Sequence, residues 1–233
     1  AIFTSGTISV PAFLFPQAAA HRIGSPEQSE KRSNSMSNTG SNKKTVILAE
    51  GAIMVALSIA LFAVSDLIPW PYAYGGGFSI FAQVPIVIYS YRRGIKNGVA
   101  ASLVLSVFQL LTGLKNFAWV SGIGAYLIVA LADYIVAFGC LGLGGMFKGK
   151  FKNPTAELAL GSVVVCLIRF VCHYISGVTI WTDYCPADMV VPVYSLVYNG
   201  SYMLIETIIT VIGAVALSKV PAVINVNGKA SKN

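Results

Sequence analysis

Six long apolar runs follow one another along this chain, and few charged residues interrupt them. Their approximate limits are 46–68, 78–91, 95–113, 122–147, 155–181 and 190–217. A helix needs about 20 apolar residues to cross a bilayer, and only the second run is clearly short. It either tilts or begins below the membrane surface, surrounded by protein. The runs predict an all-α polytopic membrane protein, a bundle of six transmembrane helices.

Composition and charge agree with a protein whose main partner is the lipid bilayer. Hydrophobic residues make up 55% of the chain and charged residues 11%, against about 25% charged in typical soluble domains. The net charge of +7 could indicate nucleic-acid binding. The basic residues, however, lie in short clusters between apolar runs, without a basic stripe interleaved with aromatic residues. Nucleic acid is therefore not an expected partner.

The distribution of Lys and Arg predicts the orientation in the cell membrane. The loops 66–77, 114–121 and 182–189 contain one basic residue, Lys115. The opposite side carries eleven: Lys43, Lys44, Arg92, Arg93, Lys96, Lys148, Lys150, Lys152, Lys219, Lys229 and Lys232. Because cytoplasmic loops are rich in Lys and Arg, both termini are predicted to be cytoplasmic.

Residues 1–44 differ from the rest of the chain. The stretch 24–44 is rich in Ser, Asn, Lys and Glu and is too polar to bury a core, so we predict a disordered extension. The predicted extension covers residues 1–44, and within it we interpret residues 1–35 as upstream or non-native sequence, because Met36 resembles a natural start. The transmembrane domain is predicted over 45–220, followed by a cytoplasmic tail over 221–233.

A few charged or hydrogen-bonding side chains fall inside the apolar runs, where each costs about 2.5–3.5 kcal/mol on insertion scales. They are Asp133, Arg169, His173, Asn199 and Glu206. At ~1.5 Å of rise per residue, Asp133, His173 and Asn199 lie about 12–15 Å below the outer surface. Three helices thus bring an acid, an imidazole and an amide to one level, which predicts a pocket that opens outward.

The fifth run carries these groups on one stripe. Arg169, His173 and Gly177 recur at intervals of four residues, with Ser176 beside them. Two interpretations stay open: the polar groups bind a ligand, or they pair with each other to hold the bundle, for example Arg169 with Asp133 or Glu206. Depth favours pairing for Arg169 and Glu206, and ligand contact for His173 and Asn199.

The residue types in the pocket indicate a class of ligand. A carboxylate among Trp and Tyr rings suits a cation, through charge pairing and a cation–π attraction of up to about 2 kcal/mol. An amide and an imidazole suit the edge of a nitrogen heterocycle. We expect a small, flat, cationic or heteroaromatic solute. On the first run, Ala52, Ala56 and Ala60 form a small-residue face for close helix packing, either against a partner or within the bundle.

The chain lacks several motifs of nucleotide-binding and catalytic proteins, which limits the functions that it can have. No GxxxxGK[ST] loop occurs, so the chain does not use ATP by itself in the usual way. Neither HExxH nor a paired-carboxylate motif occurs, and the four cysteines lack metal-site spacing. We therefore expect a transport subunit without a cofactor or metal, not an enzyme. The alternative is a stand-alone proton-coupled carrier that uses Asp133, His173 and Glu206 as a relay, although no inverted repeat supports it.

Several segments resemble a known family. They are 75–80 (GGGFSI), 92–94 (RRG), 132–138 (ADYIVAF), 140–143 (CLGL) and 194–200 (YSLVYNG), together with Arg169-Phe170, His173, Gly177 and Trp181. Over about 45–220 the chain is similar to the thiamine-specific S components of energy-coupling-factor (ECF) vitamin importers. Two positions depart from the family pattern: Asp133 stands where Glu is common, and Gly77 where Trp is expected, with Trp70 or Tyr74 as possible substitutes.

The resemblance implies a six-helix bundle that binds thiamine near its outer face, with the first extracellular loop as a lid. The alanine face of the first helix would dock on a transmembrane coupling subunit, which two ATPase subunits drive. The ligand residues that the resemblance implies are Asp133, Tyr134, His173, Gly177, Trp181, Tyr194 and Asn199.

Overall fold

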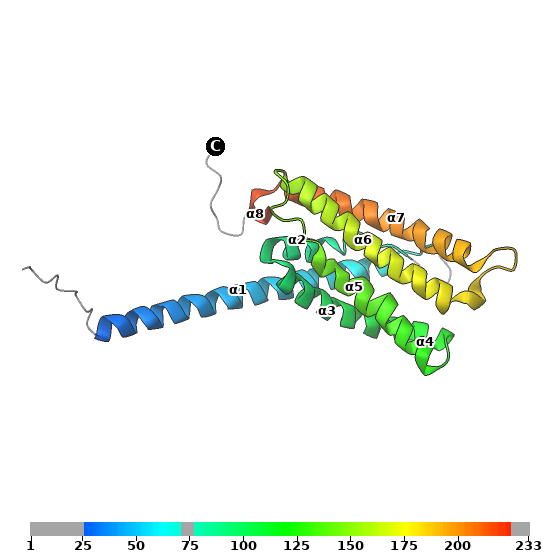
Figure 1. Ribbon diagram of the computed structural model, residues 1–233, viewed down its shortest axis with the longest axis horizontal. Helices are drawn as coiled ribbons and strands as arrows, with labels where there is room; N and C mark the ends of the chain where they lie inside the picture. The colour runs from blue at the N-terminus through cyan, green and yellow to red at the C-terminus, as the bar shows by residue number, and fades with distance from the viewer. Residues whose placement is uncertain (1–25, 71–76, 225–233) are drawn as a thin grey trace, which may run out of the picture. The chain divides into compact units, whose positions relative to one another are not determined.

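The computed structural model describes residues 26–70 and 77–224, whose regular secondary structure is helical, without a strand. The chain divides into two compact units, residues 1–42 and 43–233. The helices are labelled in Figure 1. They are α1 (Pro26–Asp66), α2 (Val84–Arg93), α3 (Ile95–Thr112), η2 (Gly113–Trp119), α4 (Ile123–Ile128), η3 (Val129–Val136), α5 (Ala137–Gly139), η4 (Cys140–Leu143), α6 (Pro154–Thr179), η5 (Thr182–Tyr184), α7 (Val191–Ser218) and α8 (Pro221–Ile224).

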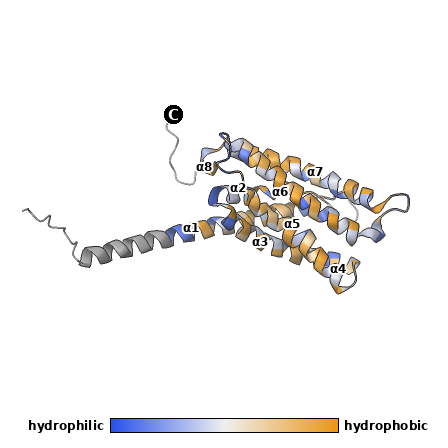
Figure 2. Ribbon diagram, viewed as in Figure 1, coloured by the Kyte–Doolittle hydropathy of each residue, from blue (hydrophilic) through white to orange (hydrophobic). Residues whose placement is uncertain are grey.

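Five helical segments of the described chain are long and apolar enough to cross a membrane, which confirms an all-α membrane protein but not the count of six. They are Asn42–Asp66, Ile95–Trp119, Ile123–Leu143, Pro154–Thr179 and Val191–Ser218. Figure 2 shows how apolar residues cover these helices. Each corresponds to one of the predicted apolar runs.

The second predicted span is shorter than its apolar run suggested. α2 has ten residues, or about 15 Å of helix, half of the hydrocarbon core. The preceding residues 77–83 are irregular, and Phe81 has a left-handed φ of 58°. Irregular backbone at membrane depth is tolerated where protein surrounds it, and α2 is accordingly buried from Val84 to Tyr91.

α1 begins earlier than the sequence predicted: it starts at Pro26 and includes most of the stretch that we expected to be disordered. Most residue types in that stretch cost at most about 0.7 kcal/mol each in a helix, so polar composition alone does not end a helix. Residues 1–25 lie outside the described residues, and the predicted domain boundaries stay predictions. Of the predicted tail, Pro221–Ile224 forms α8 and residues 225–233 lie outside the described residues.

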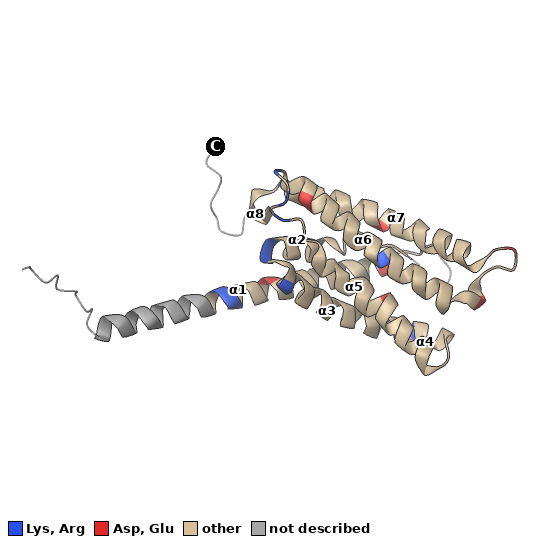
Figure 3. Cartoon of the chain, in the orientation of Figure 1, with Lys and Arg blue, Asp and Glu red and all other residues tan. Residues whose placement is uncertain are grey.

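Basic side chains gather at one end of the bundle. Figure 3 shows Lys and Arg residues at the end of α2 and in the connection between η4 and α6. Here Glu50 of α1 accepts from Nε of Arg92 at 2.5 Å and from Nε of Arg93 at 2.6 Å, and Nη1 of Arg92 donates to the carbonyl of Ala222 at 2.8 Å. This end therefore ties α1, α2 and α8 together.

A candidate ligand pocket between η3, α6 and α7

A cavity of about 190 Å³ lies among η2, η3, α5, α6 and α7. All seven residues that the sequence nominated as ligand contacts line it. The complete lining is Gly77, Asn116, Asp133, Tyr134, Phe138, Arg169, His173, Gly177, Trp181, Tyr184, Tyr194, Ser195, Tyr198, Asn199 and Tyr202. The residues that were assigned to one membrane depth on three helices therefore surround one space.

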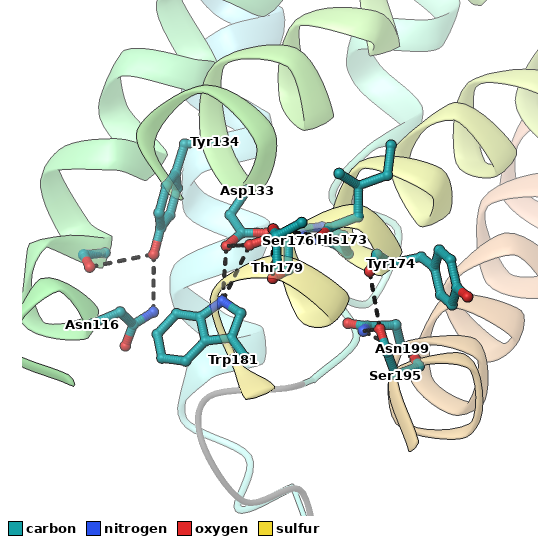
Figure 4. A network of polar contacts seen from close by, with 12 residues as sticks. Asn116, Asp133, Tyr134, His173, Tyr174, Ser176, Thr179, Trp181, Ser195 and Asn199 are labelled. Atoms are coloured by element: carbon teal, nitrogen blue, oxygen red, sulfur yellow. Dashed lines mark hydrogen bonds and ion pairs between the residues drawn. The ribbon is translucent and has the colours of Figure 1, made fainter. Parts of the chain in front are cut away.

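Asp133 is the centre of a hydrogen-bond network on one wall (Figure 4). Its Oδ1 lies 3.0 Å from Nδ1 of His173, and its Oδ2 accepts from the hydroxyl of Ser176 at 2.7 Å and from Nε1 of Trp181 at 3.3 Å. Asp133 lies in η3, which is a π-helix, a local geometry frequent at functional sites. The network gathers side chains of α6 and of the residues that follow it around a carboxylate of η3.

His173 keeps one ring nitrogen available. With Nδ1–H donated to Asp133, a neutral imidazole has Nε2 as an acceptor. This Nε2 is buried and has no hydrogen-bond partner within the described residues. Because a buried acceptor without a partner is costly, a solute that offers a donor in the cavity would gain from meeting it.

A second cluster of hydrogen bonds forms the opposite wall on α7. The amide Nδ2 of Asn199 donates to the carbonyl and hydroxyl oxygens of Ser195 at 3.0 and 3.1 Å, and the hydroxyl of Tyr202 donates to Oδ1 at 2.6 Å. Ser195 in turn donates to the carbonyl of Tyr174 on α6 at 3.0 Å. The amide is thus held in one orientation at the edge of the cavity.

Aromatic rings supply much of the remaining lining. The centroids of Trp181 and Tyr184 lie 5.7 Å apart, as do those of Tyr194 and Tyr198. Tyr134 accepts from Nδ2 of Asn116 at 2.9 Å and donates to the carbonyl of Gly113 at 3.2 Å. Ring faces beside a carboxylate form a site that attracts cations.

Arg169 and Glu206 form a pair, as their depth suggested. Nη1 of Arg169 lies 3.7 Å from Oε1 of Glu206, and the guanidinium carbon lies 4.2 Å from the ring centroid of Phe138. Arg169 also lines the cavity, whereas Glu206 does not. Pairing therefore describes these two residues better than direct ligand contact does.

Trp70 stands beside Gly77, where the family pattern has a tryptophan. A Cβ added to Gly77 would lie 3.0 Å from Cδ1 of Trp70, and the indole lies against Phe78 with centroids 3.9 Å apart. The indole of Trp70 therefore lies beside position 77, where the resemblance leads us to expect a tryptophan. The other proposed substitute, Tyr74, lies outside the described residues.

Sequence reasoning missed Asn116 and Tyr202. Asn116 lies in a segment that we interpreted as an outer loop, and η2 turns it back toward Tyr134. Tyr202 was one of many aromatic residues in an apolar run. Its place three residues after Asn199, on the same helix face, was the only signal in the sequence.

Gly177 allows α6 and α7 to approach closely at the cavity. A Cβ there would overlap the hydroxyl of Ser195 and lie 3.0 Å from Nδ2 of Asn199. We expect Gly177→Ala to destabilise the fold by about 1–3 kcal/mol, as overpacking does, and to lower the midpoint of thermal unfolding. The matched control is Gly124→Ala in α4, where a Cβ has open space. Equal midpoints for the two variants would contradict the close approach.

Comparison with known proteins gives a consistent set of relatives. The sequence model of the thiamine transporter protein family matches residues 48–225. The thiamine transporter ThiT of Bacillus subtilis is 33% identical over 181 residues, which cover 73% of this chain and 89% of that protein. The thiamine transporter ThiT of Lacticaseibacillus paracasei is 26% identical over 184 residues, with 73% and 86% covered. The solved structure of ThiT from Listeria monocytogenes shares the fold, with a TM-score of 0.63, 23% identity, and 78% and 98% coverage.

Proposed function

We propose that this chain, a member of the thiamine transporter family, is the high-affinity thiamine-binding subunit of an ECF importer. Membership of that family makes it a multi-pass membrane transport protein and not an enzyme. It captures thiamine from outside the cell and delivers it through a separate ATP-driven module. The observation that carries the proposal is the cavity lined by Asp133, Tyr134, His173, Gly177, Trp181, Tyr194 and Asn199.

Thiamine fits the chemistry of this cavity, since it joins a cationic thiazolium to an aminopyrimidine. The carboxylate of Asp133 and the neighbouring rings attract the cation. Nε2 of His173 accepts from a ligand donor, and the amide of Asn199 can exchange its internal bonds for bonds to the pyrimidine edge.

The coupling surface is proposed to lie on α1. Ala52, Ala56 and Ala60 are all exposed on this helix. The first two line a groove of about 530 Å³ between α1 and α3, with Ala100 and Ala101 on its other side. Small residues let another helix approach closely, so we assign this groove to a helix of the transmembrane coupling subunit, which two ATPases power.

The proposed topology has six helices, with both termini cytoplasmic and the protein in the cell membrane. We count α2 together with the five long spans to reach six; it is short, and its residues Val84–Tyr91 are buried. The basic end formed by Arg92, Arg93 and the connection between η4 and α6 faces the cytoplasm, because Lys and Arg are concentrated in cytoplasmic loops.

Uptake in reconstituted vesicles tests the proposed division of labour. We expect radiolabelled thiamine to accumulate only when the coupling subunit, both ATPases and ATP are present with this chain. The control replaces ATP by a non-hydrolysable analogue. Uptake by this chain alone, driven by a pH gradient, would contradict the proposal and favour a proton-coupled carrier that uses Asp133, His173 and Glu206.

A further inference from the structure

Glu206 is a buried carboxylate that does not line the cavity. It contacts both Arg169 on the cavity wall and the segment 77–83. Its side chain is 2% exposed. Oε1 accepts from the hydroxyl of Ser79 at 2.6 Å and also from Nε2 of Gln83, while Oε2 accepts from the backbone N–H of Ser79. These donors are all uncharged. Within the described residues, its charge is balanced by Arg169 at 3.7 Å.

Arg169 carries the positive charge on the cavity wall. It is 8% exposed, and its Nε and Nη1 find no hydrogen-bond partner within the described residues. A guanidinium stays protonated at all relevant pH values, and its field is strong where little water screens it. Without a compensating carboxylate, this charge would repel a cation in the cavity.

The formal charges around the cavity show why the balance matters. Asp133 and Glu206 contribute two negative charges and Arg169 one positive charge, so the group carries one net negative charge when His173 is neutral. Removal of the Glu206 charge leaves Asp133 and Arg169, which cancel. The cavity would then lose its net attraction for a cation.

The same carboxylate also holds the irregular segment 77–83 in place. Ser79 and Gln83 are its donors, and Gly77 at the start of the segment lines the cavity. Phe81 has a left-handed φ of 58°, which is uncommon for a bulky residue and persists where the surroundings enforce it. A Cβ on Gly213 would lie 2.7 Å from the ring of Phe81, so α7 holds this segment at two points.

We propose that Glu206 is a specificity-determining positioning residue: it neutralises Arg169, so that the cavity prefers a cation over an uncharged solute of the same shape, and it holds the wall that begins at Gly77. The proposal rests on the proposed function, because it takes thiamine as the cation. It assigns Glu206 no direct contact with the ligand.

The test compares two ligands on one set of variants. They are thiamine and an uncharged isostere in which the thiazolium is replaced by a neutral ring, each titrated into the purified protein in detergent. Glu206→Gln keeps the size and one acceptor oxygen. We expect it to weaken thiamine binding by about tenfold or more, and binding of the isostere by no more than about threefold. Arg169→Met in the Glu206→Gln background is expected to restore the wild-type preference.

The matched control is Glu157→Gln. Glu157 is also a buried glutamate but lies on α6, and it accepts from the hydroxyl of Tyr91 at 2.6 Å and from the backbone N–H of Phe151 at 3.0 Å. It does not line the cavity and should leave the preference for thiamine over the isostere unchanged. Equal weakening of both ligands by Glu206→Gln would overturn the proposal, because a purely structural role predicts that result.

If Glu206→Gln does not fold, Arg169→Met alone decides the matter. It leaves the donors of Glu206 in place, and we expect it to increase the preference for thiamine by about threefold or more. An unchanged preference would overturn the proposal. A wild-type protein that fails to bind thiamine would instead overturn the proposed function, so the two failures are distinguishable.

Discussion

Replacement of Ala56 by tryptophan is expected to abolish thiamine uptake by the assembled importer, while thiamine binding to the isolated subunit stays unchanged. Ala56 is exposed on α1 and lines the groove between α1 and α3, but it does not line the ligand cavity. An indole in this groove would occupy the space that we assign to a partner helix, and close helix packing in membranes depends on small residues. Uptake and binding are measured on the same preparations.

The control for this variant is Ala216→Trp, which adds the same bulk to an exposed position on α7 away from the groove. It should leave both uptake and binding intact. Normal uptake by Ala56→Trp would refute the groove as the coupling surface. Loss of binding in Ala56→Trp would show that the substitution disturbs the bundle and does not act through docking.

The second large effect is expected at Asp133. Asp133→Asn should weaken thiamine binding at least tenfold, or about 1.4 kcal/mol, because it removes the carboxylate that we propose faces the cation. The amide also fits the network poorly. Oδ2 accepts from Ser176 and Trp181, so the amide would place its oxygen there and its NH2 group toward Nδ1 of His173. The imidazole would then have to change to its other tautomer.

Asp188→Asn is the matched control, since Asp188 is exposed in the connection before α7. It makes the same chemical change and should leave the affinity unaltered. Isothermal titration calorimetry of both variants measures the difference. An unchanged affinity in Asp133→Asn would remove this residue from the site.

The long helices could be predicted from the sequence because their signal is local. An apolar run of sufficient length must form a helix in a membrane, since every backbone group needs an internal partner there. α6 and α7 accordingly lie close to the predicted runs 155–181 and 190–217. Charge asymmetry added a predicted direction, and the family comparison agrees with membrane transport.

The residue at which the short α2 begins could not be predicted in the same way. Its run is apolar, but its start depends on contacts with residues far away in the sequence. Ser79 and Gln83 meet Glu206, and the backbone N–H of Ile80 donates to the hydroxyl of Ser65 at 2.8 Å. These long-range partners replace helical hydrogen bonds over residues 77–83, and a hydropathy pattern does not reveal them.

The cavity was predictable where depth and helix periodicity determined it. Asp133, His173 and Asn199 were assigned to one level, and they line one space. The hydrogen bonds among them were not predictable. Ser176 and Trp181 both donate to Asp133, which depends on how the end of α6 turns toward η3. The sequence did not decide whether Arg169 pairs with Asp133 or with Glu206, and the structure places Glu206 beside it.

Titration of the purified chain with thiamine tests the central claim most directly. Trp181 lines the cavity, so bound thiamine should quench its fluorescence. We expect saturable quenching at one thiamine per chain, without any partner subunit, and loss of most of this signal in Trp181→Phe with binding still detectable by calorimetry. The absence of saturable binding by both methods would contradict a preformed thiamine site in this subunit.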